Sequence, residues 1–289
     1  MPKMAVAVDF EPALDPTDFA RFRRYIYEAA GIDLGPTKRA LIQSRLAKRL
    51  RALHLDSYGA YWELLKQAGA HEERQRAINA LTTNETYFFR EPDHFSWLQH
   101  YASELSECRR EPIKVWSAAC STGEEPYTMA MVLAERLGMD VAWQVMATDI
   151  NTQVTRFARR AIYPLESARK IPPHLRQRFC QRGLEEYACT VRVRPELTKR
   201  IEFSNVNLLT CANFSHDAFD VIFLRNILIY LDDSAKTSVL SLLCRKLRAG
   251  GYLVVGHSEA IQGKALPLQQ EAISRYRLVD PMTQQRSSK

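Results

Sequence analysis

From about residue 112 to its end, the sequence alternates short apolar segments with segments of helical pattern. Four apolar segments are long enough to be strands: 113–119, 142–150, 219–226 and 251–259. Such alternation is the signature of a parallel sheet whose strands are joined by helices. The sequence therefore predicts a doubly wound α/β domain over residues 112–289, with the segment SRYRLVD near its end as an edge strand.

Residues 1–85 have a different pattern, with helical segments and few runs of β-branched residues. The first helix has Asp15 and Asp18 as candidate caps and Gly31 as its stop. The second begins near Pro36, because proline suits the first position of a helix. Two more helices carry SYGAYWELLKQAG and EERQRAINALTT. We expect an all-α N-terminal domain over residues 1–85.

Two further segments fall outside these patterns. Residues 86–111 are predicted to form a linker and a connecting helix. Residues 178–205 contain FCQRG, YACTVRVR and RIEFSNVNL, in which apolar and polar residues alternate, with a short helix PELTKR among them. Alternation of this kind is typical of half-buried strands. We therefore expect a small antiparallel insertion in the parallel sheet at about residues 178–205.

The composition excludes several protein classes. Apolar residues make up 46% of the 289, which is enough for an extensive core, so the chain is neither disordered nor collagen-like. No apolar run approaches the ~18–20 residues that span a bilayer, and the N-terminus lacks the pattern of a signal peptide. We expect a cytoplasmic protein with reduced thiols. Its six cysteines have no disulfide or zinc-ligand spacing: 108, 120, 180, 189, 211 and 244.

The first strand leads into the segment AACSTGEEPY (residues 118–127), which combines a loop of small residues with the start of a helix. Strand, tight loop and helix form the nucleotide-binding element of doubly wound folds. With Gly123 as the only glycine, the loop matches neither a dinucleotide fingerprint nor a Walker A motif. Glu124 and Glu125 would repel a pyrophosphate, and they suit a ligand with positive charge and hydroxyls. S-adenosylmethionine (SAM) is such a ligand, although the two glutamates could simply complement the helix dipole.

Polar side chains also end two later strands. Asp149 closes the second strand, where an acidic residue can accept hydrogen bonds from ribose hydroxyls. Arg225 and Asn226 follow the apolar strand FDVIFL, and Tyr230 comes shortly after. Arg225 could clamp a ligand carboxylate there. The alternatives are a cap or turn role for Asp149 and the capping of neighbouring carbonyls by Arg225.

Taken together, these motifs resemble the chemotaxis receptor glutamate methyltransferase (CheR) family over nearly the whole chain. The similar segments are AGIDLGPTKRALIQSRLAKRLRAL, ALTTNETYFFRE, VWSAACSTGEEPY, ATDIN, FSNVNLL, FLRNILIYLD and GYLVVGHSE. The resemblance implies a SAM-dependent enzyme that esterifies glutamate side chains on the cytoplasmic helices of chemoreceptors, with S-adenosylhomocysteine as the other product. It also implies a helical domain followed by a Rossmann-like methyltransferase domain with an inserted β-subdomain.

The resemblance carries over residue by residue. It implies that Arg90 and Tyr230 flank the transferred methyl group. Cys120 stands where a small residue such as alanine is usual, and it could make the site sensitive to thiol reagents. The SAM contacts that the resemblance implies are Asn84, Thr86, Arg90, Glu125, Asp149, Asn207, Leu208, Arg225 and Asn226.

The helix expected over residues 36–53 carries basic residues and no acidic one. At 100° per residue its apolar side chains share one face, which leaves the basic ones beside or opposite that face. Such a face is normally only solvated. The resemblance favours docking of glutamate-rich receptor helices, with an attraction that added salt weakens. The substrate-binding candidates are Lys38, Arg45, Lys48, Arg49 and Arg51.

The implied chemistry agrees with the residues present. A glutamate side chain has a pKa of about 4.3, so the acceptor is already ionised at neutral pH. We therefore expect no metal ion and no general base, although His257 in the segment GHSE is a candidate base. The resemblance also implies a monomer associated with membrane-bound receptor arrays, and it allows capture of a receptor C-terminal peptide by the β-insertion.

Two other functions compete with this interpretation. The net charge of +7 would suit a methyltransferase of nucleic acid, but that class places a polar residue, two prolines and an aromatic after the fourth strand, where this chain has FLRNILIY. We therefore expect no nucleic-acid partner. A non-catalytic adaptor would keep the fold without binding SAM, and the presence of Glu125, Asp149 and Arg225 argues against it.

Overall fold

A computed structural model of the chain describes residues 12–210, 214, 218–261 and 266–279. The chain divides into two compact units, Met1–Thr82 and Thr83–Lys289, which are described separately. The boundary lies three residues before the end of the expected helical domain at residue 85.

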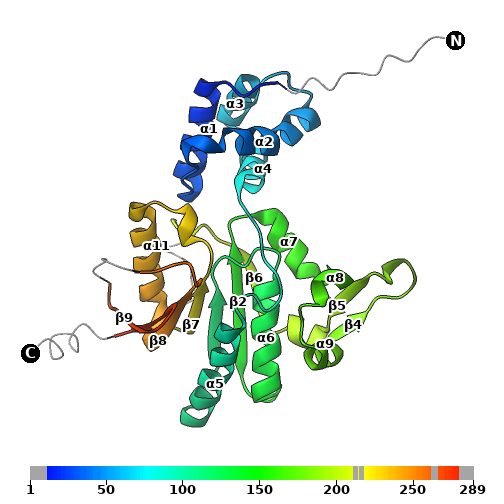
Figure 1. The fold of residues 1–289 in the computed structure, drawn as a ribbon, viewed down its shortest axis with the longest axis vertical. Coiled ribbons are helices and arrows are strands. Elements are labelled where there is room, and N and C mark those ends of the chain that lie inside the picture. The colour runs from blue at the N-terminus through cyan, green and yellow to red at the C-terminus, as the bar shows by residue number, and fades with distance from the viewer. Residues whose placement is uncertain (1–11, 211–213, 215–217, 262–265, 280–289) are drawn as a thin grey trace, which may run out of the picture. The chain divides into compact units, whose positions relative to one another are not determined.

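The first unit is helical, as its sequence predicts (Figure 1). The Asp15 carboxylate accepts hydrogen bonds from the backbone N–H groups of Thr17 and Asp18 at 2.7 and 2.8 Å, so Asp15 is the N-cap of the first helix. Gly31 ends that helix with φ 70°, a left-handed conformation that glycine adopts without strain. The elements are α1 (Pro16–Ala30), η1 (Pro36–Lys38), α2 (Arg39–Leu53), α3 (Tyr58–Lys66) and α4 (His71–Leu81).

The core of the helical unit joins aromatic side chains to the apolar face of α2. Phe22 stacks on Tyr61 with ring centroids 6.0 Å apart and meets the edge of Trp62 at 5.8 Å. Ile42 and Leu46 of α2 are fully buried, as their helical spacing predicts.

The second unit contains a seven-stranded sheet in the order β6-β2-β1-β7-β8-β10-β9. The first five strands in this order pair in parallel, and the last two add antiparallel pairs. The strands are β1 (Ile113–Ser117), β2 (Trp143–Asp149), β6 (Ile201–Asn205), β7 (Phe219–Leu224), β8 (Leu247–Val255), β9 (Leu268–Ala272) and β10 (Arg275–Leu278).

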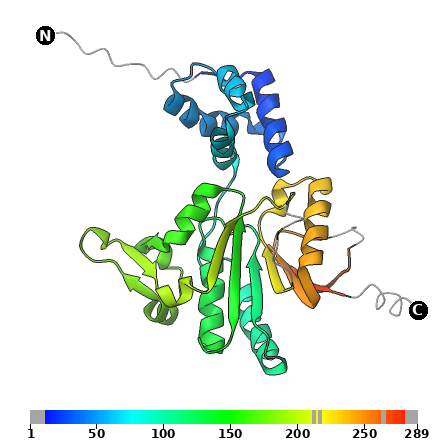
Figure 2. The same ribbon diagram turned by 180° about the vertical axis from the view of Figure 1, so that it is seen from behind.

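Helices cover both faces of this sheet. Alternate residues of a strand enter different cores: Val115 packs with α5 and α6, whereas its neighbour Trp116 packs with α11. In Figure 1, α5 and α6 lie in front of the strands, and in Figure 2 the strands face the viewer. The arrangement is therefore doubly wound. The helices are α5 (Pro92–Cys108), α6 (Glu124–Leu137), α7 (Thr152–Arg160), η4 (Leu228–Tyr230) and α11 (Asp233–Lys246).

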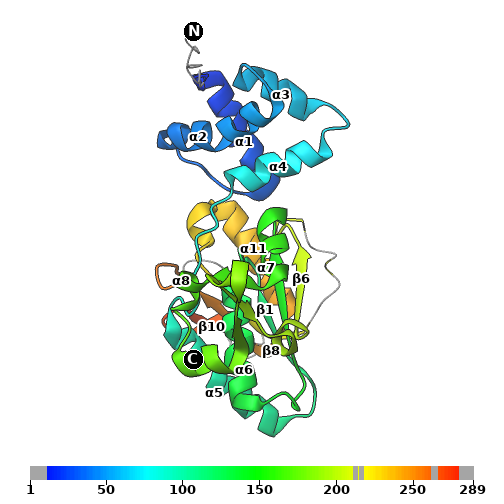
Figure 3. The same ribbon diagram turned by 90° about the vertical axis from the view of Figure 1, so that its right-hand side faces the viewer.

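A small antiparallel sheet in the order β3-β5-β4 is inserted between α7 and β6, as predicted, and Figure 3 brings it toward the viewer. Its extent differs from the expected 178–205, because the sheet begins with β3 and ends with β5. Its elements are β3 (Ile162–Pro164), α8 (Leu165–Ala168), α9 (Pro173–Phe179), β4 (Cys180–Arg182), η2 (Glu185–Tyr187) and β5 (Thr190–Val193), followed by α10 (Pro195–Thr198).

Two strands were predicted correctly as strands but lie at other positions in the sheets than expected. The segment IEFSN forms β6, which pairs in parallel with β2 in the main sheet. Its alternating pattern arises because an edge strand is buried on one face only, and this pattern does not distinguish a parallel edge from an antiparallel sheet. SRYRLVD contains β10, which lies between β8 and β9 and is therefore not the edge strand.

Candidate active site

Polar residues collect where four neighbouring parallel strands end. The loop after β1 contains Ser121, Asp149 ends β2, Arg225 follows β7, and Glu259 lies beyond β8. In open α/β sheets this carboxyl edge is the place where ligands bind. The structure thus brings residues 100 or more positions apart in the sequence to one rim of the sheet.

The loop after β1 is held in a conformation that depends on small residues. Ser121 has φ 48° and Gly123 has φ 96°. A Cβ on Gly123 would lie 2.7 Å from both Ala158 Cβ and Tyr163 Oη, so only glycine is accommodated there. Cys120 in the same loop is 1% exposed, and burial raises the pKa of its thiol well above the usual value, which disfavours the reactive thiolate.

Asp149 ties this loop to β2. Its carboxylate accepts hydrogen bonds from the backbone N–H groups of Ser121 at 2.8 Å and Asn151 at 2.9 Å. Burial raises the pKa of Asp149, although these two hydrogen bonds act in the opposite direction. The Ser121 hydroxyl in turn donates to the carbonyl of Asn84 at 2.8 Å, so the start of the α/β unit reaches the same loop.

Arg225 joins two carboxylates, and we call Arg225, Glu91 and Glu125 the Arg225 cluster. Arg225 Nη1 lies 3.0 Å from Glu125 Oε2, and Nη2 lies 3.0 Å from Glu91 Oε2. Nη2 also donates to the carbonyl of Arg90, while the buried Nε has no hydrogen-bond partner among the described residues. The guanidinium therefore contacts two carboxylates of this chain, and its role as a clamp on a ligand carboxylate stays a prediction.

The two carboxyl groups of the Arg225 cluster respond differently to burial. Burial raises the pKa of Glu125, and the nearby charge of Arg225 offsets this only in part. Burial also acts on Glu91, but there the charge and hydrogen bond of Arg225 outweigh it and lower the pKa. One guanidinium thus faces two carboxyl groups, so carboxyl groups outnumber cationic groups within the Arg225 cluster.

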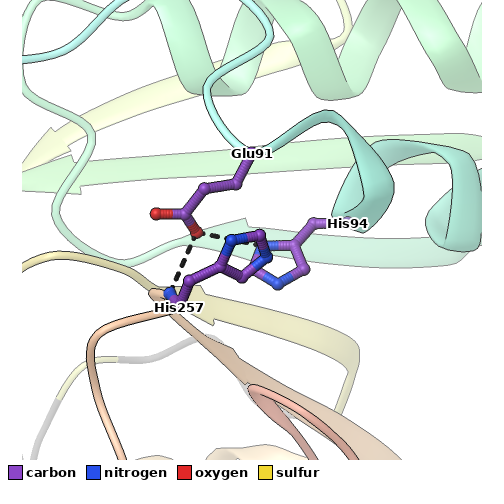
Figure 4. A group of neighbouring side chains, drawn as sticks. All are labelled: Glu91, His94 and His257. Atoms are coloured by element: carbon purple, nitrogen blue, oxygen red, sulfur yellow. Dashed lines mark hydrogen bonds and ion pairs between the residues drawn. The ribbon is translucent and has the colours of Figure 1, made fainter.

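Glu91, His94 and His257 form a compact group beside this cluster (Figure 4). Their nearest nitrogen and oxygen atoms lie within 4.8 Å of one another, close enough to hold a metal ion. Burial, followed by the charge of Arg225, lowers the pKa of His94 to about 4, so its ring is neutral at pH 7. A metal ion bound to Glu91 Oε2 would compete for that oxygen with Arg225 Nη2, which lies 3.0 Å from it. The absence of a metal ion stays a prediction.

The other predicted residues lie in segments around the same rim. Arg90 Nη1 donates to the carbonyl of Glu85 at 3.1 Å, and its guanidinium lies 5.8 Å from the ring centroid of Tyr87. His257, the candidate base, has Nε2 3.1 Å from Asp93 Oδ2. Thr86 lies before α5, and Tyr230 is the last residue of η4. Asn207 and Leu208 follow β6.

Sequence reasoning missed two carboxylates of this rim. Glu91 was quoted only as the end of the motif ALTTNETYFFRE, yet it contacts Arg225 and also accepts a hydrogen bond from Asn226 Nδ2 at 3.3 Å. Glu259 ends the motif GYLVVGHSE and accepts backbone hydrogen bonds from the loop after β7. Both carboxylates lie within segments that resemble the CheR family, and this position in the sequence is the feature that could have identified them.

The basic helix differs in part from the expected outward surface. Lys48 and Arg51 of α2 are exposed, as is Lys38 just before it. Arg45 and Arg49 are only partly exposed, because Arg45 Nη1 donates to the carbonyl of Leu81 at 2.7 Å and Arg49 binds Glu73 with two contacts of 2.8 Å. These two side chains turn inward because the buried Glu73 carboxylate and the carbonyl of Leu81 at the end of α4 accept their hydrogen bonds.

Known proteins resemble both units. The family model described as "CheR methyltransferase, all-alpha domain" matches residues 17–82, and the one described as "CheR methyltransferase, SAM binding domain" matches residues 84–277. A "Chemotaxis protein methyltransferase" of Salmonella typhimurium is 44% identical over 86% of this chain and 85% of its own length. "Chemotaxis protein methyltransferase 2" of Pseudomonas aeruginosa is 41% identical over 84% and 86%, respectively. Among the described residues, no helix has the length and apolar character needed to cross a membrane.

Proposed function

The chain belongs to the CheR methyltransferase family, and we propose that it transfers the methyl group of SAM to glutamate side chains of chemoreceptors. The products would be glutamate methyl esters and S-adenosylhomocysteine. The reaction would serve sensory adaptation in chemotaxis, with the enzyme in the cytoplasm at membrane-bound receptor arrays.

The Arg225 cluster is the observation that supports this proposal best. SAM carries a sulfonium, an ammonium and one carboxylate, so it brings a net positive charge. Two carboxyl groups around one guanidinium, with the Asp149 carboxylate nearby at the end of β2, favour such a ligand over a nucleotide phosphate. Asp149 stands at the strand end that commonly binds ribose hydroxyls. We therefore assign the SAM-contacting roles to the residues that the sequence predicts.

The chemistry requires positioning more than acid–base groups. An ionised glutamate oxygen attacks the methyl carbon in line with the C–S bond, and the bonding pair leaves with sulfur, which becomes a neutral thioether. The acceptor has a pKa of about 4.3, so no proton has to be removed from it at neutral pH. Holding the two reactants in line can supply about 7–11 kcal/mol of the barrier reduction. Arg90 and Tyr230 would flank the methyl group and orient the carboxylate.

Receptor docking is proposed for two surfaces, each within one unit. Lys38, Lys48 and Arg51 are exposed on or beside α2 and would attract glutamate-rich receptor helices. The small sheet has β4 at an edge, where an extended receptor C-terminal peptide could add as a further strand. The enzyme would act as a monomer and without nucleic acid.

Calorimetric titration with SAM, followed by incubation with tritiated SAM and receptor-rich membranes, tests the proposal. We expect SAM binding, label on the receptor, and release of labelled methanol after alkaline treatment. Asp149→Ala should weaken SAM binding by roughly 10-fold or more, because a hydrogen bond to a charged group contributes about 1.5–3 kcal/mol. A wild-type protein that binds no SAM would support the adaptor function. Label that alkali does not release would refute a methyl ester.

A further inference from the structure

The loop after β7 is held by a carboxylate from the segment after β8. Glu259 is 6% exposed, and its Oε2 accepts hydrogen bonds from the backbone N–H groups of Asn226 at 2.8 Å and Gly256 at 2.7 Å. Its Oε1 accepts from the N–H of Leu228 at 2.7 Å. Three backbone donors on two segments thus converge on one buried carboxyl group.

This contact compensates two unfavourable features of the loop. Asn226 has φ 58°, a left-handed conformation that costs free energy for a residue other than glycine and persists only where its surroundings fix it. Leu228 begins η4, and the residue before it, Ile227, offers no side-chain cap. Glu259 therefore supplies the missing acceptor at the start of η4 from a different part of the chain.

The segment after β8 also fits closely against Asn226. A Cβ on Gly256 would lie 2.6 Å from Asn226 Nδ2 and 3.2 Å from its backbone nitrogen. The absence of a side chain at Gly256 therefore lets Asn226 take its place, where its Nδ2 donates to Glu91 Oε1 at 3.3 Å. Glu259 and Gly256 constrain the same residue from one side.

We infer that Glu259 is a positioning residue, which fixes Asn226 at the cofactor site and η4 with Tyr230 beside the reacting methyl group. This inference rests on the proposed function for the roles of Asn226 and Tyr230, whereas the constraint on the loop itself does not. Glu259 would touch neither SAM nor receptor. It would act through the backbone of the loop.

Glu259→Gln tests the role with little change in shape. The amide keeps one acceptor oxygen and places an NH2 group against a backbone N–H, so at least one of the three hydrogen bonds is lost. We expect the SAM dissociation constant to rise about 10-fold. We also expect a lower kcat for receptor methylation at saturating SAM, because Tyr230 would no longer be fixed. Hydrogen exchange of a peptide spanning residues 225–231 should become faster.

Asp220→Asn is the matched control. Asp220 is also buried and ties two strands together, since its Oδ2 accepts from the backbone N–H of Lys114 at 2.8 Å. It lies near the amino end of β7, whereas Asn226 follows the carboxyl end of the same strand. The control should lower thermal stability while leaving the SAM dissociation constant, kcat and exchange of residues 225–231 at wild-type values.

Gly256→Ala would place a Cβ 2.6 Å from Asn226 Nδ2 and 2.9 Å from Glu259 Oε2, so it disturbs the same contact without changing Glu259, and it remains informative if Glu259→Gln folds poorly. We expect the same direction of change in SAM affinity and in exchange of the 225–231 peptide. Wild-type SAM affinity and wild-type exchange in both variants would overturn the inference. If wild-type protein methylates no receptor, the proposed function fails, and faster exchange in the two variants would still support the constraint on the loop.

Discussion

The two units contain the same chemical groups in opposite proportions. In the helical unit, Glu73 receives two hydrogen bonds from Arg49 at 2.8 Å, one from Tyr61 at 2.8 Å and one from Arg76 at 3.3 Å, and we call these four residues the Glu73 cluster. In the α/β unit, the Arg225 cluster has one arginine between two carboxyl groups. Two arginines contact one buried carboxylate in the first case, although Arg76 also contacts the exposed Glu72 at 3.2 Å, and one arginine contacts two carboxyl groups in the second.

This difference shows that a buried carboxylate can either have all its partners within the protein or remain able to bind a cationic ligand. Burial acts to raise the pKa of Glu73, but the hydrogen bonds from Arg49 and Tyr61 outweigh it and the pKa is lowered. In the Arg225 cluster the burial of Glu125 prevails and its pKa is raised. A carboxylate with all its acceptor sites occupied stabilises the fold, whereas one left short of positive charge favours a cationic ligand.

The largest effect is expected from Glu125→Gln. The substitution keeps the shape of the side chain and removes its charge, so the attraction for the SAM cation falls. The SAM dissociation constant should rise by roughly 10- to 100-fold, since a hydrogen bond to a charged group contributes about 1.5–3 kcal/mol. Calorimetry at fixed ionic strength measures it. An unchanged affinity would remove the Arg225 cluster from the cofactor site.

The same substitution in the other cluster should affect stability alone. Glu73→Gln removes the charged partner that Arg49 contacts and leaves Arg76 with only the exposed Glu72, 3.2 Å away, so the free energy of unfolding should fall by about 1–3 kcal/mol. This lies below the usual cost of breaking a buried pair because both arginines are partly exposed, 22% and 47%. Urea unfolding followed by circular dichroism provides the measurement. A loss of SAM affinity in this variant would contradict the contrast between the two clusters.

The Arg225 cluster and the Glu73 cluster should also differ in how their contributions to stability depend on pH. The pKa values of Glu125 and Asp149 are raised in the folded protein, so their contribution to its stability is full below their unfolded pKa values and is lost as pH rises through the folded ones. A SAM cation offsets that loss, because it interacts best with the ionised forms. The rise in melting temperature on adding saturating SAM should therefore grow as the pH increases above the unfolded pKa values, 4.5 for Glu125 and 3.8 for Asp149.

The contribution of Glu73 to stability depends on pH in the opposite direction. Its lowered pKa gives a stabilising contribution that is present above the unfolded pKa and is lost as pH falls through the folded one. Acid should therefore destabilise the Glu73 cluster of the free protein, and Glu73→Gln should reduce that part of the acid sensitivity. A SAM-induced shift that is flat across the same pH range would contradict the assignment of Glu125 and Asp149.

The smallest effect is expected at the exposed end of the basic helix. Reversal of Lys48 and Arg51 to Glu should reduce receptor methylation about 2- to 5-fold at low salt and have no effect on SAM affinity. Reversal of Arg24 and Lys66, exposed on α1 and α3, changes the net charge equally and is the control. The two double variants should converge at high salt, where charges are screened. Equal activities at low salt would refute docking on α2.

Local sequence was sufficient to predict much of this molecule. The spacing of Ile42 and Leu46 marked the buried face of α2, and Asp15 and Gly31 marked the ends of α1. The positions of Asp149 and Arg225 at the carboxyl ends of their strands followed from the alternation of strands and helices, because parallel strands end at one edge. These features depend on neighbours a few residues away, and periodicity records such neighbours.

Other features depended on partners that the sequence pattern does not name. β6 was assigned to the wrong sheet because half-buried strands share one pattern whichever neighbour they pair with. Arg45 and Arg49 were expected to face outward, but Leu81 and Glu73 of α4 draw them in. A basic helical face contains no information on a carboxylate that another helix brings alongside.

The sequence by itself determined the two kinds of unit, the alternation of the main parallel strands with helices, and the edge of the sheet that carries the polar residues. The tertiary structure alone decided that Arg225 binds Glu91 and Glu125, and that Glu259 fixes Asn226. The reason is that the fold of an element follows from its local pattern of apolar residues, whereas the charge state and conformation of a site follow from groups distant in the chain that folding brings within 3 Å of one another.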